Sequence, residues 1–253
     1  IRVALLSSLV CLVKLFNNSD LQRINVQVVV AASDDKSWRV RHELAKIFPS
    51  LIEGFGSHIN ELIPTYANLI KDSETEVKIA ALEGVETVVN NISSEKVAVC
   101  IIPAILALSN ESSIYVKSLI GEALGTISKS VGYATYFSKL STVFDALVKD
   151  DSADVRLGIA KSIYNIVLSS DQSNLPTNIQ IITTLLKDKN YKIRETMIST
   201  IAKISIFYGI DLFRPNFEVL FFYYLTDSIS AVREQGIICL EVSSFIIYNI
   251  ISY

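Results

Sequence analysis

Apolar residues recur along this chain in steps of three and four positions, which keeps them on one face of an α-helix. The same stripe is repeated in four segments: Ile1, Leu5, Leu9, Leu12 and Phe16; Val40, Leu44, Phe48, Leu51 and Phe55; Val116, Ile120, Leu124, Ile127 and Val131; and Ile193, Met197, Ile201, Ile204 and Tyr208. A strand would scatter these residues over both of its faces. The pattern therefore predicts equivalent amphipathic helices in a repeating unit, which we call B helices.

The B helices are predicted to end at a shared position, because Gly56, Gly132 and Gly209 each follow a stripe. Glycine tolerates the left-handed backbone conformation that ends many helices. A second set of apolar anchors follows in each unit: Val29/Ala32, Tyr66/Leu69, Ile105/Leu108, Phe144/Leu147, Ile182/Leu185 and Phe221/Tyr224. We assign these anchors to A helices, so that each unit is an A helix followed by a B helix.

One segment fits a strand as well as a helix. Val26, Val28 and Val30 alternate with other residues, including Gln27, in a pattern that is typical of a strand. Val29 and Ala32 nevertheless occupy the anchor positions of an A helix. The register of the repeat therefore predicts a helix in this segment.

Charged residues repeat with the same period as the helices. A basic residue recurs at intervals of 37 to 39 positions, always after Val or Ile, and an acidic residue stands six positions before all but the first. The pairs are Asp35–Arg41, Asp72–Lys78, Glu111–Lys117, Asp150–Arg156, Asp188–Arg194 and Asp227–Arg233, and Arg2 is the first base. Self-similarity at this period is typical of a solenoid of helix pairs.

Paired charges of this kind could serve general acid–base chemistry or phosphate binding. Because the pairs recur in every unit, whereas an active site would occur once, we interpret them as a structural ladder. Its carboxylates would cap the B helices or bridge to the base of the next unit. We call these residues the acid–base ladder.

The repeat predicts an all-α fold, an α-solenoid (superhelix) of antiparallel helix pairs. Residues 1–253 would form a single array of about six and a half units. The turns within the units are expected near residues 36–39, 73–76, 112–115, 151–154, 189–192 and 228–231. Since Ile1 and Arg2 already stand partway through a unit, we expect the chain to be a fragment of a longer solenoid.

Composition narrows the class further. Half of the residues are apolar, while 9 are Gly and 5 are Pro, which favours long helices. The apolar segments 26–32 and 237–251 are too short, or carry Glu241, to match the roughly 20 apolar residues of a membrane span. A membrane is therefore not expected as a partner. Net charge is −3 with both signs interspersed, so nucleic acid is not expected as a partner either.

The three cysteines, Cys11, Cys100 and Cys239, stand far apart and fit neither a disulfide framework nor the spacing of metal ligands. We interpret them as small buried side chains in a reducing compartment. This predicts a cytoplasmic protein, which could also enter the nucleus.

Several short segments resemble the HEAT repeat and, more narrowly, the scaffold (A, 65 kDa regulatory) subunits of protein phosphatase 2A. They are Asp35-Lys36-Ser37-Trp38-Arg39-Val40-Arg41, Leu62-Ile63-Pro64, Leu69-Ile70-Lys71-Asp72, Asp154-Val155-Arg156-Leu157 and Ala231-Val232-Arg233-Glu234. The resemblance implies a HEAT/armadillo-like fold without catalytic activity, cofactor or metal. It also implies a scaffold that holds regulatory (B-type) subunits together with a phosphatase catalytic subunit through turns within the repeats.

The resemblance also assigns protein-binding residues by position. It implies that Ser37, Trp38 and Arg39 meet regulatory subunits, and that Tyr191 and Lys192 meet the catalytic subunit. At the second turn Tyr and Lys replace the Trp and Arg of the family, and Lys lacks the forked geometry of Arg. Trp38 is the only tryptophan, and an exposed Trp beside Arg is typical of a binding hot spot. The alternative is that Trp38 folds back onto the adjoining unit.

Two other classes compete with a phosphatase scaffold. A HEAT-repeat transport receptor or adaptor would bind protein cargo on its concave face, but irregular units or acidic inserted loops would be expected, and this period is even. A helical-repeat DNA glycosylase would need a basic inner surface, whereas the B helices carry several glutamates, among them Glu43, Glu83, Glu122 and Glu195. The sequence contains no Gly-rich phosphate loop or nucleophile motif, so a non-catalytic role is predicted.

Overall fold

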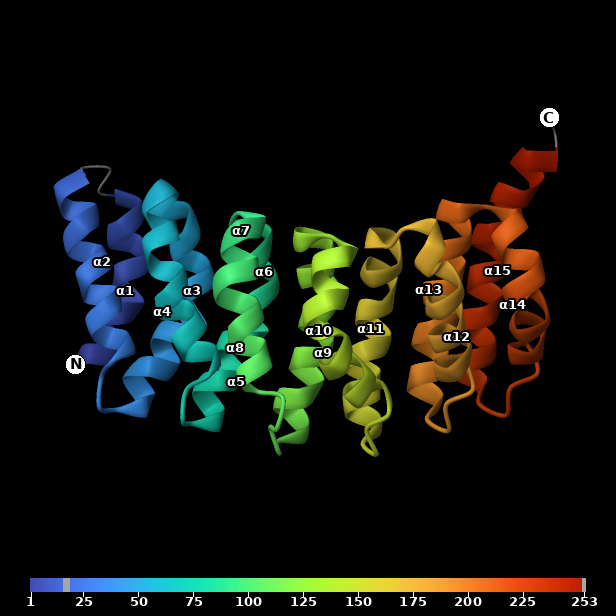
Figure 1. Ribbon diagram of the computed structural model, residues 1–253, viewed down its shortest axis with the longest axis horizontal. Helices are drawn as coiled ribbons and strands as arrows, with labels where there is room; N and C mark the ends of the chain where they lie inside the picture. Colours follow the sequence, from blue (N-terminus) through green and yellow to red (C-terminus); the bar gives the residue numbers. More distant parts are fainter. Residues whose placement is uncertain (16–18, 252–253) are drawn as a thin grey trace.

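A computed structural model describes residues 1–15 and 19–251 of the chain. Throughout this part the chain forms helices joined by short turns, and it contains no strand. Figure 1 shows the helices standing side by side in one row, with the two ends of the chain at opposite ends of the row. The predicted all-α solenoid of antiparallel helix pairs is therefore confirmed.

The helices alternate between the two predicted kinds. The B helices are α1 (Arg2–Leu15), α3 (Trp38–Phe55), α5 with α6 (Thr75–Glu83, Val85–Asn90), α9 (Ile114–Val131), α11 (Ala153–Ser169), α13 (Tyr191–Tyr208) and α15 (Ser230–Ile251). The A helices are α2 (Ser19–Ser33), α4 (Ile59–Ile70), the composite of α7, the π-helix η2 and α8 (Ser94–Lys96, Val97–Ile101, Ile102–Ala107), α10 (Tyr133–Val148), α12 (Leu175–Leu186) and α14 (Ile210–Tyr224). Short 3₁₀ helices η1 (Gly56–His58) and η3 (Gln172–Asn174) lead into α4 and α12. The ambiguous valine-rich segment lies within α2, as its register predicted.

Glycines end three of the B helices. Gly56, Gly132 and Gly209 follow α3, α9 and α13 with φ angles of 51°, 80° and 85°. Only glycine adopts this half of backbone space without steric cost. The chain can therefore leave each B helix and enter the next A helix within a few residues.

The predicted apolar stripes form the core in most units. On α3 the whole stripe from Val40 to Phe55 is buried, and so are the anchors Tyr66 and Leu69 of α4. Because each helix pair packs on the pair before and the pair after it, one continuous apolar layer runs along the row.

The first B helix departs from its predicted stripe. Leu6, Leu9 and Val13 are buried in α1, whereas Leu5 is exposed; Phe16 lies outside the described residues. Among the described residues, helix α1 packs mainly on α2 and α3, which leaves its other face largely uncovered.

Cys11 of α1 is exposed and only Cys239 is fully buried, so the expectation that all three cysteines are buried was wrong.

The B helices pack more closely against one another than the A helices do, which makes the B row the inner side of the array. The closest approach joins α9 and α11. A Cβ atom on Gly158 would lie 2.3 Å from the carbonyl oxygen of Ser118, and one on Gly125 would lie 2.7 Å from that of Ser162. Glycine at these positions is therefore required for the two helices to touch through their backbones.

The turns within the units lie along one edge of the row, the lower edge in Figure 1. They comprise residues 34–37, 71–74, 108–113, 149–152, 187–190 and 225–229. They come about two residues earlier than predicted, because the B helices begin at positions such as Trp38 and Tyr191 that were assigned to the turns.

Candidate protein-binding surfaces

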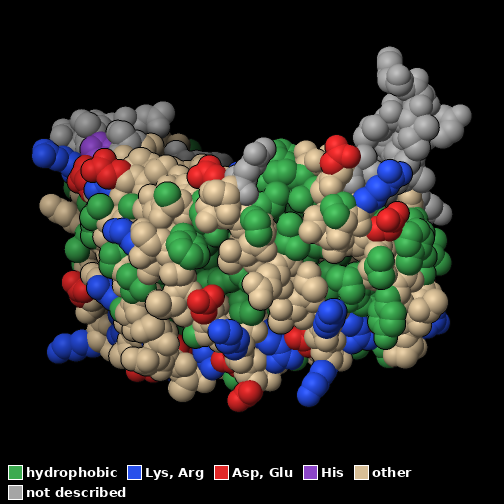
Figure 2. Space-filling model, turned by 45° about the vertical axis from the view of Figure 1, so that its right-hand side comes forward, with side chains coloured by type: hydrophobic (Ala, Val, Ile, Leu, Met, Phe, Trp, Pro, Cys, Tyr) green, Lys and Arg blue, Asp and Glu red, His purple; other side chains and the backbone are tan. Residues whose placement is uncertain are grey.

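The acid–base ladder runs along the edge formed by these turns. Each base reaches the acid of the following unit, in the pairs Arg2–Asp35 (3.0 Å), Arg41–Asp72 (2.6 Å), Lys78–Glu111 (2.7 Å), Lys117–Asp150 (2.6 Å), Arg156–Asp188 (2.7 Å) and Arg194–Asp227 (2.9 Å). Each carboxylate thus pairs with the base of the preceding unit, the opposite direction to the one expected. Figure 2 shows side chains of both charges gathered along this lower edge.

Each ladder acid also orders its own turn. An oxygen of Asp72 accepts the backbone N–H of Glu74 at 2.9 Å, and one of Asp188 accepts that of Asn190 at 2.8 Å. The same contact recurs in the pairs Asp35/Ser37, Glu111/Ser113, Asp150/Ser152 and Asp227/Ile229. The N–H belongs to the residue just before the B helix, so the acid fixes the turn that precedes the helix instead of capping its first turn.

Arginine and lysine make different rungs of the ladder. The Nε and Nη2 atoms of Arg156 donate to both carboxylate oxygens of Asp188, at 2.7 and 3.0 Å, while Nη1 donates to the backbone carbonyl of Asp150 at 2.7 Å. Arg41 and Arg194 repeat this arrangement. A lysine places one ammonium group on one oxygen, so these three arginine rungs tie their own turn to the next turn more firmly.

All rungs except Arg2–Asp35, whose arginine is 68% exposed, are largely shielded from water, and this perturbs their ionisation. Only 14% of the Arg194 side chain and 5% of the Asp227 side chain are exposed. The hydrogen bond from Arg194 holds the pKa of Asp227 below its ordinary value, and that from Lys78 does the same for the pKa of Glu111. At Asp72 burial acts to raise the pKa, but the Arg41 guanidinium and the N–H of Glu74 lower it further than burial raises it.

These shifts predict how stability depends on pH. A carboxylate whose pKa is lower in the folded state stabilises the fold fully above its unfolded pKa of about 4, and the contribution disappears as the pH falls through the folded value. We expect the melting temperature, followed by circular dichroism, to be nearly constant from pH 7 to 5 and to drop below about pH 4. Asp150→Asn should melt at a lower temperature at pH 7 and show a smaller acid-induced drop. If the melting temperatures of the two proteins fell equally with pH, the ladder carboxylates would not be the origin of the acid sensitivity.

The residues that the sequence assigned to regulatory subunits lie at the start of α3. Trp38 is partly buried and packs against the core. It is therefore neither fully exposed nor fully folded back onto the adjoining unit, the two alternatives that the sequence left open. The guanidinium carbon of Arg39 lies 4.8 Å from the centre of the Trp38 ring, and the ring of His42 meets it edge-on at 6.1 Å. Arg39 is exposed, whereas the backbone N–H of Ser37 is held by Asp35. An aromatic face and a cation are therefore presented together at the edge.

Tyr191 and Lys192, which were assigned to the catalytic subunit, form the first turn of α13. Both are exposed, Tyr191 by 37%. They stand at the same edge as Trp38 but four units further along the row, so the structure does not bring the two predicted sites together.

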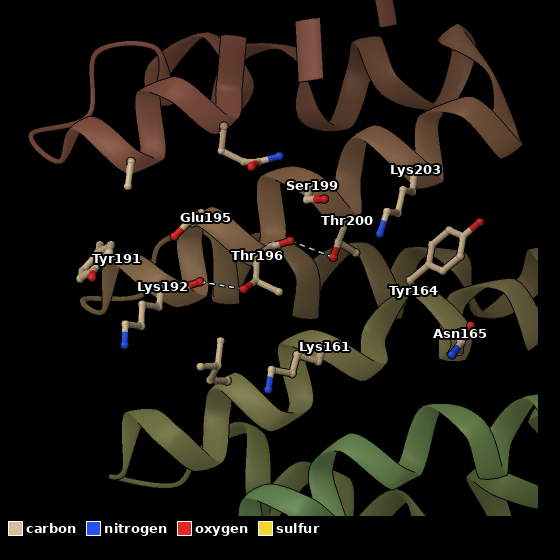
Figure 3. Close-up of a pocket in the computed structure, with 13 residues that line it drawn as sticks. Lys161, Tyr164, Asn165, Tyr191, Lys192, Glu195, Thr196, Ser199, Thr200 and Lys203 are labelled. Carbon is tan, nitrogen blue, oxygen red and sulfur yellow. Dashed lines mark hydrogen bonds between the residues drawn. The ribbon is translucent and has the colours of Figure 1, made fainter. Parts of the chain in front are cut away.

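The described part of the inner surface carries a groove of about 740 Å³ between α11, α13 and α15. Its lining includes Lys161, Tyr164, Asn165, Lys192, Glu195, Ser199 and Lys203. Figure 3 shows the Lys161 side chain on α11 and the Lys192 and Lys203 side chains on α13 reaching into the gap between these helices. Sequence reasoning missed this groove because it counted the glutamates of all B helices together. A comparison of the solvent-facing positions unit by unit would have found the lysines.

The described residues contain no group of three or more His, Cys, Asp or Glu side chains that could hold a metal ion. Of the helices in that part of the chain, none combines the length and apolarity needed to cross a bilayer.

The fold is shared with several solved structures. The karyopherin Kap121p matches with a TM-score of 0.68 at 17% identity, covering 83% of this chain and 22% of that one. Cex1p matches with a TM-score of 0.63 at 18% identity, covering 87% and 42% of the two chains. A designed armadillo repeat protein in complex with the peptide (KR)4 matches with a TM-score of 0.59 at 16% identity, covering 84% and 97%. At these identities the likeness shows the HEAT/armadillo-type fold alone.

Comparison of sequences identifies relatives more specifically than comparison of folds. The human serine/threonine-protein phosphatase 2A 65 kDa regulatory subunit, in its A beta isoform, is 32% identical over 122 residues, which are 46% of this chain and 20% of that protein. The resemblance inferred from the ladder motifs is thereby confirmed, although the chain spans only about a fifth of the length of this relative. The family model described as PIK3R4-like, middle domain matches residues 56–214, well over half of the chain. The chain therefore belongs to the PIK3R4-like middle-domain family of HEAT-type repeat arrays.

Proposed function

We propose that this chain is a non-catalytic scaffold of a protein phosphatase 2A-type assembly, which holds a catalytic and a regulatory subunit on separate parts of its turn edge. The observation that supports this most is the 32% identity over 122 residues to a 65 kDa regulatory subunit of phosphatase 2A. A protein with this role would act in the cytoplasm, and in the nucleus if its partners enter it.

The geometry of the edge suits such a role. The ladder fixes the turns to one another through side chains that are mostly shielded from water, so the edge is ordered before any partner binds. Preorganisation lowers the entropy cost of association. Two proteins held on one rigid array are also kept at a high effective concentration relative to each other.

The edge residues divide between the two subunits in this proposal. Trp38 with Arg39 offers an aromatic and a guanidinium group, which are over-represented among binding hot spots. Tyr191 with Lys192 offers an aromatic and an ammonium group four units away. The Ser37 side chain flanks the first pair.

Titration of the chain with a B-type regulatory subunit, and separately with a phosphatase 2A catalytic subunit, tests this assignment. Trp38→Ala should weaken binding of the regulatory subunit by about tenfold or more, as expected for a hot spot, and leave binding of the catalytic subunit unchanged. Lys192→Glu should weaken binding of the catalytic subunit only. Lys139→Glu, at an exposed position of the A helix α10, is the control for charge and should change neither affinity.

Circular dichroism checks that each variant keeps its helix content. Failure of the unaltered chain to bind either subunit would contradict the proposal. Equal losses for both subunits with each variant would refute the division of the edge.

A further inference from the structure

We infer that the groove between α11, α13 and α15 binds a short, extended, acidic segment of a partner protein. This site lies on the inner face of the array, and the proposed phosphatase contacts lie along the turn edge. Only Tyr191 and Lys192, at one end of the groove, belong to both surfaces.

The charge of the groove favours an anionic ligand. Three lysines line it against one glutamate, Glu195, although the chain as a whole carries a net charge of −3. Lys161 is paired with Glu122 of α9 at 2.7 Å. Within the described residues, neither Lys192 nor Lys203 has a carboxylate at ion-pair distance. These two ammonium groups are therefore available to carboxylates of a ligand.

Lys203 lies at the end of the groove opposite Tyr191 and Lys192 (Figure 3). Its ammonium nitrogen lies 6.0 Å from the centre of the Tyr164 ring, which belongs to the neighbouring helix α11. A cation over an aromatic face is held there only weakly. Figure 3 shows both side chains at the same gap between the helices, so a carboxylate entering it would meet the lysine directly.

Polar groups that can bind a peptide backbone lie beside the lysines. In the described structure Asn165 and Ser199 make no hydrogen bond through their side chains, and both are partly exposed on the groove wall. An asparagine amide offers both a donor and an acceptor, which matches the N–H and C=O of an extended chain. The hydroxyl of Thr196 donates to the carbonyl of Lys192 and keeps its lone pairs free to accept.

The dimensions fit a short segment better than a folded domain. Neighbouring helices pack about 8–10 Å apart, so the groove spans on the order of 20 Å from α11 to α15. An extended chain covers this distance with about six residues. The volume of about 740 Å³ is that of a cleft for a few side chains.

The charge pattern favours a peptide over a nucleic acid. A nucleic acid would be expected to follow a basic stripe along several units. The inner face changes sign beyond α11, where Glu122 of α9 and Glu83 of α5 follow. The positive region is therefore confined to one groove, as suits a short acidic segment.

A fluorescein-labelled peptide of eight glutamates, titrated with the full chain at low ionic strength, tests this inference by anisotropy. We expect saturable binding, roughly tenfold weaker binding for Lys203→Glu, and binding a few-fold tighter for Glu195→Gln, since charge complementarity governs such contacts. Lys139→Glu on the convex helix α10 changes net charge equally and should have little effect.

Three results would overturn the inference. They are the absence of saturable binding, equal binding of a peptide of eight lysines, and equal effects of Lys203→Glu and Lys139→Glu. Tighter binding of a single-stranded oligonucleotide with eight phosphates, with the same sensitivity to Lys203→Glu, would assign the groove to nucleic acid instead. Because Lys203 lies outside the turn edge, these results are independent of the phosphatase titrations.

Discussion

Replacing Gly158 with alanine should lower the free energy of unfolding by about 2–4 kcal/mol, at the upper end of the cost of overpacking. The reason is the backbone contact between α11 and α9, where the new methyl group would lie 2.3 Å from the carbonyl oxygen of Ser118. A side chain could rotate away from such a contact, but a helix backbone can yield only if the two helices separate. In a solvent-exposed helix the same substitution stabilises by about 1 kcal/mol, because alanine is the better helix former.

Gly236→Ala provides the matched control in the B helix α15. Its nearest neighbour would be a terminal methyl carbon of Leu225 at 3.0 Å, which belongs to a flexible side chain. We expect the urea midpoint of this variant to be unchanged or slightly raised, while that of Gly158→Ala falls clearly. Equal midpoints for the two variants would show that α9 and α11 do not pack through their backbones.

Removal of one arginine of the acid–base ladder should lower the free energy of unfolding nearly as much as Gly158→Ala. We expect Arg156→Ala to destabilise the chain by about 2–3 kcal/mol, because it leaves the shielded carboxylate of Asp188 without its bidentate partner. The same substitution removes the donor to the carbonyl of Asp150, so two turns lose their connection together. No chemical activity should be affected, since the rung has a structural role.

An exposed ion pair on the helices serves as the control for the cost of removing Arg156. Lys161 and Glu122 are 52% and 37% exposed, against 18% and 8% for Arg156 and Asp188. Lys161→Ala should therefore cost less than about 1 kcal/mol. A double-mutant cycle of Arg156→Ala with Asp188→Asn should give a coupling energy of about 1 kcal/mol or more. If the effects of the two substitutions on stability were additive, Arg156 and Asp188 would not interact directly.

The repeat could be predicted from the sequence because its signals are local and recur. The spacing of Val40, Leu44 and Phe48 specifies a helix face, and Gly132 marks the end of a helix whatever surrounds it. Repetition in every unit also showed that the charged pairs belong to the architecture. The helical nature of the segment around Val29 followed from register alone.

Other features depend on how the units stack, which no single segment encodes. Asp72 stands six residues before Lys78, but the stacking places it against Arg41 of the preceding unit. The exposure of Leu5 follows from the absence of a helix against that face of α1 within the described chain. The groove joins Lys161 to Lys203 only because α11 and α13 lie side by side.

Hydrogen exchange of Arg156→Ala, compared with the unaltered chain, tests most directly whether the ladder joins the units into one array. We predict faster exchange in the turns on both sides of the lost rung, residues 149–152 and 187–190. The distant turn at residues 71–74 should keep its protection. Unchanged exchange at residues 187–190 would contradict the claim that this rung connects neighbouring units.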